Sequence, residues 1–344
     1  MSIKKIVTGL ALSLLLGSGS GAAVAADYYS AYSTYQSGDY KAAFKEMLPF
    51  AEQGNIDAQF WIAHMYSSGL GVPQNYKTAV KWYTLSAEQG DEYAQHSLGV
   101  SYDHGEGVPE NDKTAVKWYT LAAEQGYAGA QYSLGVMYSN GYGVPENDKT
   151  AVKWYTLAAE QGYAKGQYNL GTMYANGRGV PENHKTAVKW YTLAAEQGNA
   201  DAQYNLGVMY DKGRGVLESD KTAIKWYTKS AEQGYARAQY NLGTMYHNGD
   251  GVPENDKTAV KWYTKSAKQG DAEAQSNLGF MYAKGQGVLT DSKRAYMWFN
   301  LGSYNGYENA GENKDKIAKQ MTPADISKAQ DMSSRCLESN YTDC

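Results

Sequence analysis

Apolar residues recur in two stripes of helical spacing within each stretch of 36 residues along most of the chain. In the stretch that follows Gly126, a Gly-x-Gly-Val-Pro segment beginning at Gly141 separates the two stripes. Its glycines suit a helix end and a tight turn. The first stripe comprises Ala130, Leu134, Met137 and Tyr138, and the second comprises Ala151, Trp154, Tyr155, Ala158 and Ala159. The pattern predicts a pair of α-helices.

This helix pair repeats at a constant interval. A tryptophan and a glycine each recur every 36 residues without insertions. The positions are Trp82, Trp118, Trp154, Trp190, Trp226, Trp262 and Trp298, and Gly54, Gly90, Gly126, Gly162, Gly198, Gly234, Gly270 and Gly306. A fixed period of about 20 to 50 residues is typical of a solenoid, in which stacked neighbours bury stripes that no pair buries alone. The sequence therefore predicts one all-α solenoid with the tryptophans in its core.

A residue that can cap a helix precedes each second helix. The same position is always Asn, Ser or Asp, whose short side chain accepts a hydrogen bond from free backbone N–H groups. The residues are Asn75, Asn111, Asn147, Asn183, Ser219, Asn255 and Asp291. Each second helix is expected to end at the Ala-Glu-Gln-Gly type of segment.

The two ends of the array depart from the repeat. We expect a shorter capping helix pair, similar to a tetratricopeptide unit, over residues 27–54 and seven tandem repeats over 55–306. Residues 307–344 are expected to form a C-terminal cap with a cysteine-containing tail. Within this cap the pattern predicts loss of the regular helix over 307–320. A final helix then follows Thr322-Pro323 and continues to about Leu337.

The first 26 residues have the features of a secretory signal peptide. Lys4 and Lys5 precede a short apolar run from Ile6 to Leu16, and small residues ending in Ala25-Ala26 follow. The apolar run is too short to span a membrane, which is about 30 Å thick in its hydrocarbon core. No cysteine for lipid attachment lies near the cleavage site. We expect a periplasmic or secreted protein without a membrane span after cleavage.

The repeat resembles the Sel1-like repeat, a relative of the tetratricopeptide repeat. The matching residues in one copy are Ala130, Leu134, Gly135, Tyr138, Gly141, Gly143, Val144, Pro145, Ala151, Trp154, Tyr155, Ala158, Ala159 and Gly162. The resemblance covers roughly residues 39–306. It implies a right-handed α/α superhelix of helix pairs that works by binding other proteins along a concave face.

Composition and charge argue against other classes. After removal of the signal peptide, 30 basic and 36 acidic residues leave a net charge of −6, unlike a nucleic-acid binder with a basic face. The five histidines form no paired metal-ligand motif, and the Gly-x-Gly loops lack the features of a phosphate-binding loop. No G-x-S-x-G or S-x-x-K motif occurs in the mature chain. We expect no enzyme activity, no cofactor and no metal.

Positions that vary between copies are the candidates for partner contact. The third, sixth, tenth and thirteenth residues after each repeat glycine lie on one face of the first helix. At the sixth position stand Phe60, His96, Tyr132, Tyr168, Tyr204 and Tyr240, and beside it stand Asn169, Asn205, Asn241 and Asn277. Tyrosine is enriched at interface hot spots. Either these residues bind a partner, or the tyrosines pack between first helices while the asparagines bond neighbouring backbone; the two interpretations are compatible.

Two cysteines lie near the C-terminus. Cys336 and Cys344 are eight residues apart, and an exported chain favours a disulfide between them. The alternative is a pair of free thiols on a disordered tail.

The sequence thus predicts an exported scaffold or adaptor that binds another protein, of unknown identity, on its first-helix face. Two alternatives remain. One is a periplasmic immunity or inhibitor protein that neutralises an effector toxin, such as a lipase-type effector. The other is a secreted virulence factor that binds host proteins. The sequence leaves the oligomeric state open.

Overall fold

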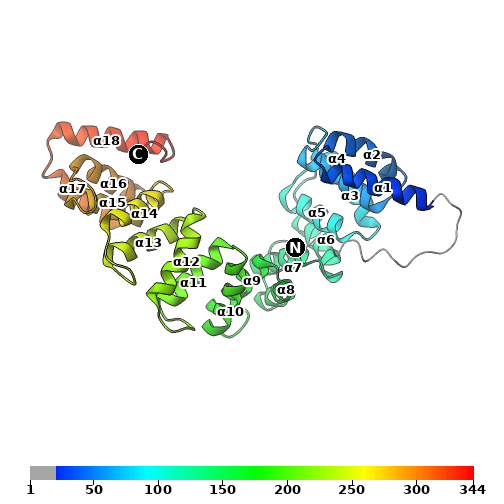
Figure 1. Cartoon of the computed structure of the whole chain (residues 1–344), viewed down its shortest axis with the longest axis horizontal. Helices are drawn as coiled ribbons and strands as arrows, with labels where there is room; N and C mark the ends of the chain where they lie inside the picture. Colours follow the sequence, from blue (N-terminus) through cyan, green and yellow to red (C-terminus); the bar gives the residue numbers. More distant parts are fainter. Residues whose placement is uncertain (1–20) are drawn as a thin grey trace. The chain divides into compact units, whose positions relative to one another are not determined.

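The computed structural model describes residues 21–344, which form eighteen α-helices and no strand (Figure 1). Most of the predicted signal peptide, residues 1–20, lies outside the described residues. The chain divides into two compact units, one ending at Asn147 and the other spanning Asp148–Cys344. The helices of unit 1 are α1 (Gly21–Gln36), α2 (Tyr40–Glu52), α3 (Ile56–Ser68), α4 (Tyr76–Glu88), α5 (Glu92–His104), α6 (Asp112–Glu124) and α7 (Ala128–Asn140).

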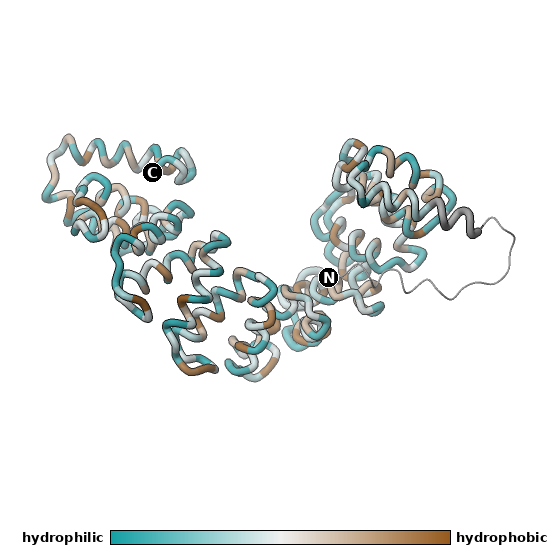
Figure 2. Tube along the Cα trace, viewed as in Figure 1, coloured by the Kyte–Doolittle hydropathy of each residue, from teal (hydrophilic) through white to brown (hydrophobic). Residues whose placement is uncertain are grey.

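Unit 2 continues the same alternation of first and second helices. Its helices are α8 (Asp148–Glu160), α9 (Ala164–Asn176), α10 (His184–Glu196), α11 (Ala200–Asp211), α12 (Asp220–Glu232), α13 (Ala236–Asn248), α14 (Asp256–Ala267), α15 (Ala272–Lys284), α16 (Ser292–Tyr304), α17 (Glu308–Ala318) and α18 (Pro323–Glu338). Apolar and polar residues alternate along each helix, so that each has one face for the core (Figure 2). None of the described helices is long and apolar enough to cross a membrane.

The predicted caps set the start of the second helices. Asn75 accepts a hydrogen bond from the backbone N–H of Thr78 at 3.0 Å, and Ser219 caps α12 in the same way. The Gly-x-Gly loop ahead of the cap packs on the preceding repeat. At Gly251, with φ of +68°, an added Cβ would lie 2.6 Å from Cβ of Asp220 at the start of α12. Only glycine fits here, because both the positive φ and the close approach exclude a side chain.

The residue at the centre of most pairs is a tyrosine of the second helix, and the prediction that the repeat tryptophans lie in the core is confirmed only in part, because most of them pack at its edge. Tyr227 and Tyr263 are completely buried, whereas the tryptophan preceding each tyrosine is half-buried in most copies. Only Trp226 and Trp298 are buried among the seven repeat tryptophans. Both residue types lie on the apolar stripe, but the tyrosine points at the first helix. Gly207 of α11 leaves the space that the Tyr227 ring fills.

Neighbouring repeats are joined by buried glutamines, which the repeat pattern alone did not indicate. Gln59 donates from Nε2 to the carbonyl oxygen of Ala51 at 3.1 Å, and its own Oε1 accepts from Gln89 at 2.8 Å. The same pair recurs within unit 2, where Gln233 donates to Gln203 at 2.7 Å. A buried amide costs free energy unless its groups are bonded, so each glutamine fixes the distance between one repeat and the next.

At the C-terminus, the prediction of lost helix over residues 307–320 was wrong, because α17 occupies Glu308–Ala318. The predicted final helix is confirmed as α18, which starts at the Thr322 cap and ends at Glu338. Its buried side chains pack on α16.

The tail beyond α18 folds back onto the array. Cys336 and Cys344 are joined by a disulfide, and the Cys336 side chain is fully buried. We call the series of hydrogen-bonded glutamines that joins successive repeats the glutamine ladder. Asn305 takes the place of a glutamine in this series and donates to Gln275 at 2.9 Å. The hydroxyl of Tyr341 bonds the Asn305 side chain at 2.8 and 3.0 Å. The tail therefore closes the glutamine ladder.

The contact between Gly207 and Tyr227 is testable by the substitution Gly207→Ala. A Cβ at this position would lie 2.6 Å from Cδ1 of the Tyr227 ring. Overpacking of this kind costs about 1–3 kcal/mol. Without the clash, Gly→Ala inside a helix would stabilise by about 0.5–1 kcal/mol, so the sign of the change is diagnostic. We expect a lower urea midpoint, and a higher one would contradict this packing.

The buried cap of α5 makes unit 1 sensitive to pH. Asp91 accepts a hydrogen bond from Ala94 at 2.6 Å, and burial, with help from Glu92 and Asp57, raises the pKa of the Asp91 carboxyl to about 6. Because the folded-state pKa lies above the unfolded value, the stability contribution of this group falls as pH rises from about 4 to 6.

Asn at the corresponding position caps α3 and α11, so Asp91→Asn keeps a cap that the fold already uses. We expect the melting temperature of this variant to exceed that of the wild type at pH 7 and the difference to shrink at pH 4. Thermal melts of both proteins across this range measure it. A difference that does not change with pH would mean that Asp91 is not the group responsible.

Candidate functional site

We define the first-helix face as the third, sixth, seventh, tenth and thirteenth positions after each repeat glycine. It lies on α3, α5 and α7 in unit 1 and on α9, α11, α13 and α15 in unit 2. These positions are neighbours because residues three, four and seven apart share one side of an α-helix. The opposite stripe, with Leu206 and Met209 in α11, is buried in the core.

In unit 2, the sixth-position tyrosines are half-buried and held by the second helix of their own repeat. The ring centroids of Tyr204 and Tyr227 are 5.9 Å apart, and the corresponding pairs of Tyr168 with Tyr191 and Tyr240 with Tyr263 are 6.0 Å apart. The rings therefore have a fixed orientation and leave part of their surface open to solvent. Tyr204 also packs on Tyr235 at 5.0 Å.

In unit 1, the same position holds different side chains. Phe60 contacts Tyr83 at 6.0 Å between ring centroids, and His96 lies 5.5 Å from Tyr119. Burial lowers the pKa of His96 to about 4, so its imidazole is neutral at pH 7. Tyr132 of α7 is half-buried. The sixth position of unit 1 thus holds three different uncharged side chains.

The asparagines beside the tyrosines are half-buried and connect successive repeats. Burial raises the pKa of Tyr191 to about 12, and a hydrogen bond with Asn205 partly opposes this shift; hydrogen bonds with Asn241 and Asn277 oppose the rise in the same way at Tyr227 and Tyr263. Each of these asparagines therefore lies beside a tyrosine hydroxyl of the preceding repeat; one of the two interpretations had expected a contact with neighbouring backbone. Asn169 is also half-buried.

The variable residues at the tenth and thirteenth positions provide a hydrogen-bond partner for the buried hydroxyl of the second-helix tyrosine. Tyr227 donates to Asp211 at 3.3 Å, whereas the hydroxyl of Tyr263 donates to Thr244 at 3.2 Å. Burial and the neighbouring carboxylate raise the pKa of Tyr227 far above its usual range, so it stays protonated and donates. The partner is thus at either the thirteenth or the tenth position.

The residues at the tenth and thirteenth positions are correlated in the sequence. The reason for the correlation becomes clear once the tyrosine contact is known. Where the tenth position is Thr, as at Thr172 and Thr244, the thirteenth is Ala175 or His247. Where the tenth is His or Val, the thirteenth is Ser67, Asp103, Ser139 or Asp211. The last repeat has Phe299 in place of the tyrosine, and both Phe280 and Ala283 lack a hydrogen-bonding group. Variation at these two positions is therefore explained by a structural requirement and not by a partner.

The side chains that remain for a partner are the open edges of the sixth-position rings and the exposed residues around them. The third position changes from Lys165 through Asp201 and Arg237 to Glu273 along unit 2, so its charge alternates. Phe280 of α15 is 43% exposed. The face offers aromatic surface between charges of both signs.

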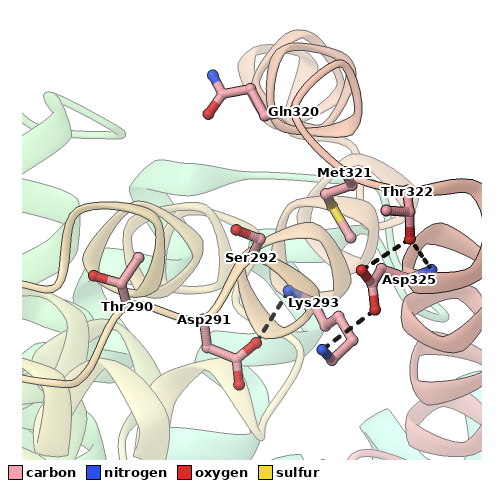
Figure 3. A pocket seen from close by; sticks show the side chains of 8 residues that line it. All are labelled: Thr290, Asp291, Ser292, Lys293, Gln320, Met321, Thr322 and Asp325. Atoms are coloured by element: carbon pink, nitrogen blue, oxygen red, sulfur yellow. Dashed lines mark hydrogen bonds and ion pairs between the residues drawn. The ribbon is translucent and has the colours of Figure 1, made fainter.

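No group of three or more potential metal-ligating side chains occurs within residues 21–344. A hollow of about 450 Å³ lies between the starts of α16 and α18. Its polar groups bond one another, since Asp325 accepts from Thr322 at 2.9 Å and from Lys293 at 3.4 Å (Figure 3). Asp291 at its edge caps α16. These contacts account for the hollow as part of the C-terminal cap.

The comparisons with known proteins agree with this architecture. The family model described as Sel1 repeat matches seven consecutive segments, residues 56–91, 92–127, 128–163, 164–199, 200–235, 236–271 and 272–307. A search of curated proteins finds no match. A Sel1 repeat protein from Oxalobacter formigenes is 34% identical, covers 86% of this chain and 88% of its own, and has a TM-score of 0.66.

Two further solved structures match this chain. The protein c5321, a protective antigen of uropathogenic Escherichia coli, is 31% identical over 93% of this chain and 86% of its own, with a TM-score of 0.49. The immunity protein Pa5087 of Pseudomonas aeruginosa is 22% identical over 62% of this chain and 81% of its own, with a TM-score of 0.39. With a family model matched over seven repeats and all-helical pairs throughout residues 21–344, the chain belongs to the Sel1 repeat family.

Proposed function

We propose that this chain is an exported, non-enzymatic scaffold that binds a partner protein on its first-helix face. The observation that carries the proposal is the row of half-buried rings at Tyr168, Tyr204 and Tyr240, which keep part of their surface open to solvent. Each ring is held against a buried tyrosine, so little conformational freedom remains to be lost on binding. Rigid aromatic surface of this kind is typical of interface hot spots.

Export to the periplasm or beyond the cell is part of the proposal. It is supported by the signal-peptide features of residues 1–26 and by the Cys336–Cys344 disulfide. Disulfides persist in oxidising compartments and are rare in the cytosol. The alternating charges of the third position favour a partner surface that carries both signs.

The test compares three baits made from the mature chain, residues 27–344. The first is the wild type, and the second carries Tyr→Ser at 168, 204 and 240. Serine stands at this position in α15, as Ser276, so the fold already accommodates it. The third is a matched control with Ser in place of three exposed lysines of second helices, Lys185, Lys221 and Lys257.

We expect the wild type and the lysine control to retain the same partner from an envelope extract, and the tyrosine variant to lose it. A hot-spot side chain contributes at least about 2 kcal/mol, which corresponds to a loss of affinity of about 30-fold for each tyrosine. Circular dichroism confirms that each bait is folded. Equal capture by all three baits would move the binding site away from this face. The identity of the partner then separates a toxin-neutralising role from an adaptor or a host-binding role.

A further inference from the structure

The second helices are near-identical copies, but two of them in unit 2 differ from the others in charge. The last eight residues of α4, α6, α8 and α10 each contain one lysine and one glutamate and carry no net charge. The corresponding segment of α12, residues 225–232, carries a net charge of +1, and that of α14, residues 261–268, carries +3. Positive charge is therefore concentrated on two successive repeats of a chain whose mature form has a net charge of −6.

Three residues cause this difference. Lys229 and Lys265 stand where α4, α6, α8 and α10 have leucine, and Lys268 stands where these helices and α12 have glutamate. With Lys225 and Lys261, whose position is lysine in all of these helices, they form a set of five that we call the lysine patch. Four of the five side chains are exposed, and that of Lys268 is half-buried.

The lysines of the patch share one side of each helix. Residues four and seven apart lie on the same side, so Lys261, Lys265 and Lys268 are neighbours on α14, as Lys225 and Lys229 are on α12. Because α12 and α14 are equivalent helices of successive repeats in unit 2, equivalent positions face the same way.

Two contacts place α12 and α14 beside each other. The loop that leads into α14 packs on the start of α12, where a Cβ at Gly251 would lie 2.6 Å from Cβ of Asp220. Further along, Trp262 of α14 packs against the core cluster to which α12 contributes Tyr227 and Ala231. The lysine patch is therefore one surface within unit 2.

Tryptophan rings lie beneath two of the ammonium groups. Those of Lys229 and Lys265 are 4.8 Å and 4.5 Å from the ring centroids of Trp226 and Trp262. A cation over an aromatic face is attracted by the ring. Within residues 21–344 no lysine of the patch forms an ion pair, so the charges are available to a ligand.

Few carboxylates oppose these charges. Glu232 is the one carboxylate in the two segments, and it forms no ion pair within the described part of the chain. At the border of the patch, Lys268 donates to the carbonyl oxygen of Thr342 at 3.4 Å, and the neighbouring Asp343 forms no ion pair with it.

The fold does not require the added lysines. Lysine near the C-terminus of a helix interacts favourably with the helix dipole, which could explain its presence in the last turn of α12. However, α8 and α10 have the same length as α12 and end at the equivalent glutamate without it. The departure from the other copies therefore has another explanation.

We propose that the lysine patch binds the anionic headgroups of a lipid bilayer and so orients unit 2 on a membrane surface. A cluster of about four to eight basic residues on a helix surface is typical of binding to anionic lipid. The half-buried Trp262 adds a ring of the kind that is enriched at membrane–water interfaces. Since charges are screened over about 8 Å at physiological ionic strength, acidic residues elsewhere in the chain do not cancel the patch.

A protein partner fits this surface less well. Protein interfaces are depleted in lysine at their centre and depend on aromatic or apolar anchors. No exposed large apolar side chain occurs on α12 or α14. Lysine also lacks the planar fork with which arginine recognises a single carboxylate or phosphate group. These features favour a surface of many mobile anionic groups.

The first experiment measures flotation of the mature chain, residues 27–344, with two kinds of vesicle. One contains equal parts of phosphatidylglycerol and phosphatidylcholine, and the other contains phosphatidylcholine alone. We expect binding to the anionic vesicles only, and a decrease in binding as the salt concentration rises. No binding to the anionic vesicles, or equal binding to both kinds, overturns the proposal.

The second experiment removes the patch with residues that the fold already contains. Lys229→Leu, Lys265→Leu and Lys268→Glu give α12 and α14 the residues of α8 and α10. We expect an unchanged melting profile and a loss of vesicle affinity of about 100-fold, at about fivefold for each lysine. Vesicle binding equal to that of the wild type contradicts the proposal.

A matched control removes the same net charge from unit 1. It carries Lys41→Glu, Lys77→Ser and Lys113→Ser, all at exposed positions. We expect this control to bind anionic vesicles as the wild type does. A loss as large as that of the patch variant would mean that only the total charge matters, and would also overturn the proposal.

The third experiment moves the patch to two earlier repeats of unit 2. In the patch variant, Leu157→Lys, Leu193→Lys and Glu196→Lys place the same residues on α8 and α10. We expect vesicle binding to recover, because headgroups respond to charge and not to a defined set of neighbours, and no recovery contradicts the proposal. The sixth-position tyrosines are unchanged in all of these variants, so capture of a protein partner on the first-helix face is expected to stay the same.

Discussion

The contact on which most of the repeat helix pairs depend is between a second-helix tyrosine and a first-helix glycine. Gly171, Gly207 and Gly243 each leave the space that a tyrosine ring fills, and the ring centres the pair. Burying a tyrosine also buries its hydroxyl, which needs a partner at low dielectric. That partner comes from the tenth or thirteenth position, so one ring determines both the packing and the residues beside the first-helix face.

Much of the fold was predictable because its determinants are local. Caps such as Asn75 and Ser219 satisfy free N–H groups within three residues, so the sequence marks the helix starts directly. The period itself predicts stacking. The distinction between Trp and the adjacent Tyr was not predictable, since both lie on one stripe and burial is decided by the direction of the neighbouring helix. The helix over Glu308–Ala318 was missed because its apolar stripe is sparse, with only Ala310 and Ile317 buried.

The sequence predicts where on the helices the candidate site lies, but it does not predict which of these residues contact a partner. Differences between the copies identify which residues vary, but they do not separate variation for a partner from variation for a buried hydroxyl. Thr244 occurs together with His247, and Val208 together with Asp211. The residues at these two variable positions therefore depend on the hydrogen bond that one tyrosine requires. The contact through Asn241 depends on the offset between repeats, which no local pattern contains.

The way the glutamine ladder ends has a consequence for the length of the array. Asn305 continues the ladder and Tyr341, 36 residues later, completes it with a hydroxyl that bonds both groups of the asparagine amide. The contact of Tyr341 involves only the last side chain of the ladder, Asn305, so it does not depend on how many repeats precede it. Gain or loss of a whole copy by recombination between near-identical segments would leave both termini intact. The fold can thus change its reach in steps of one repeat without redesign of its ends.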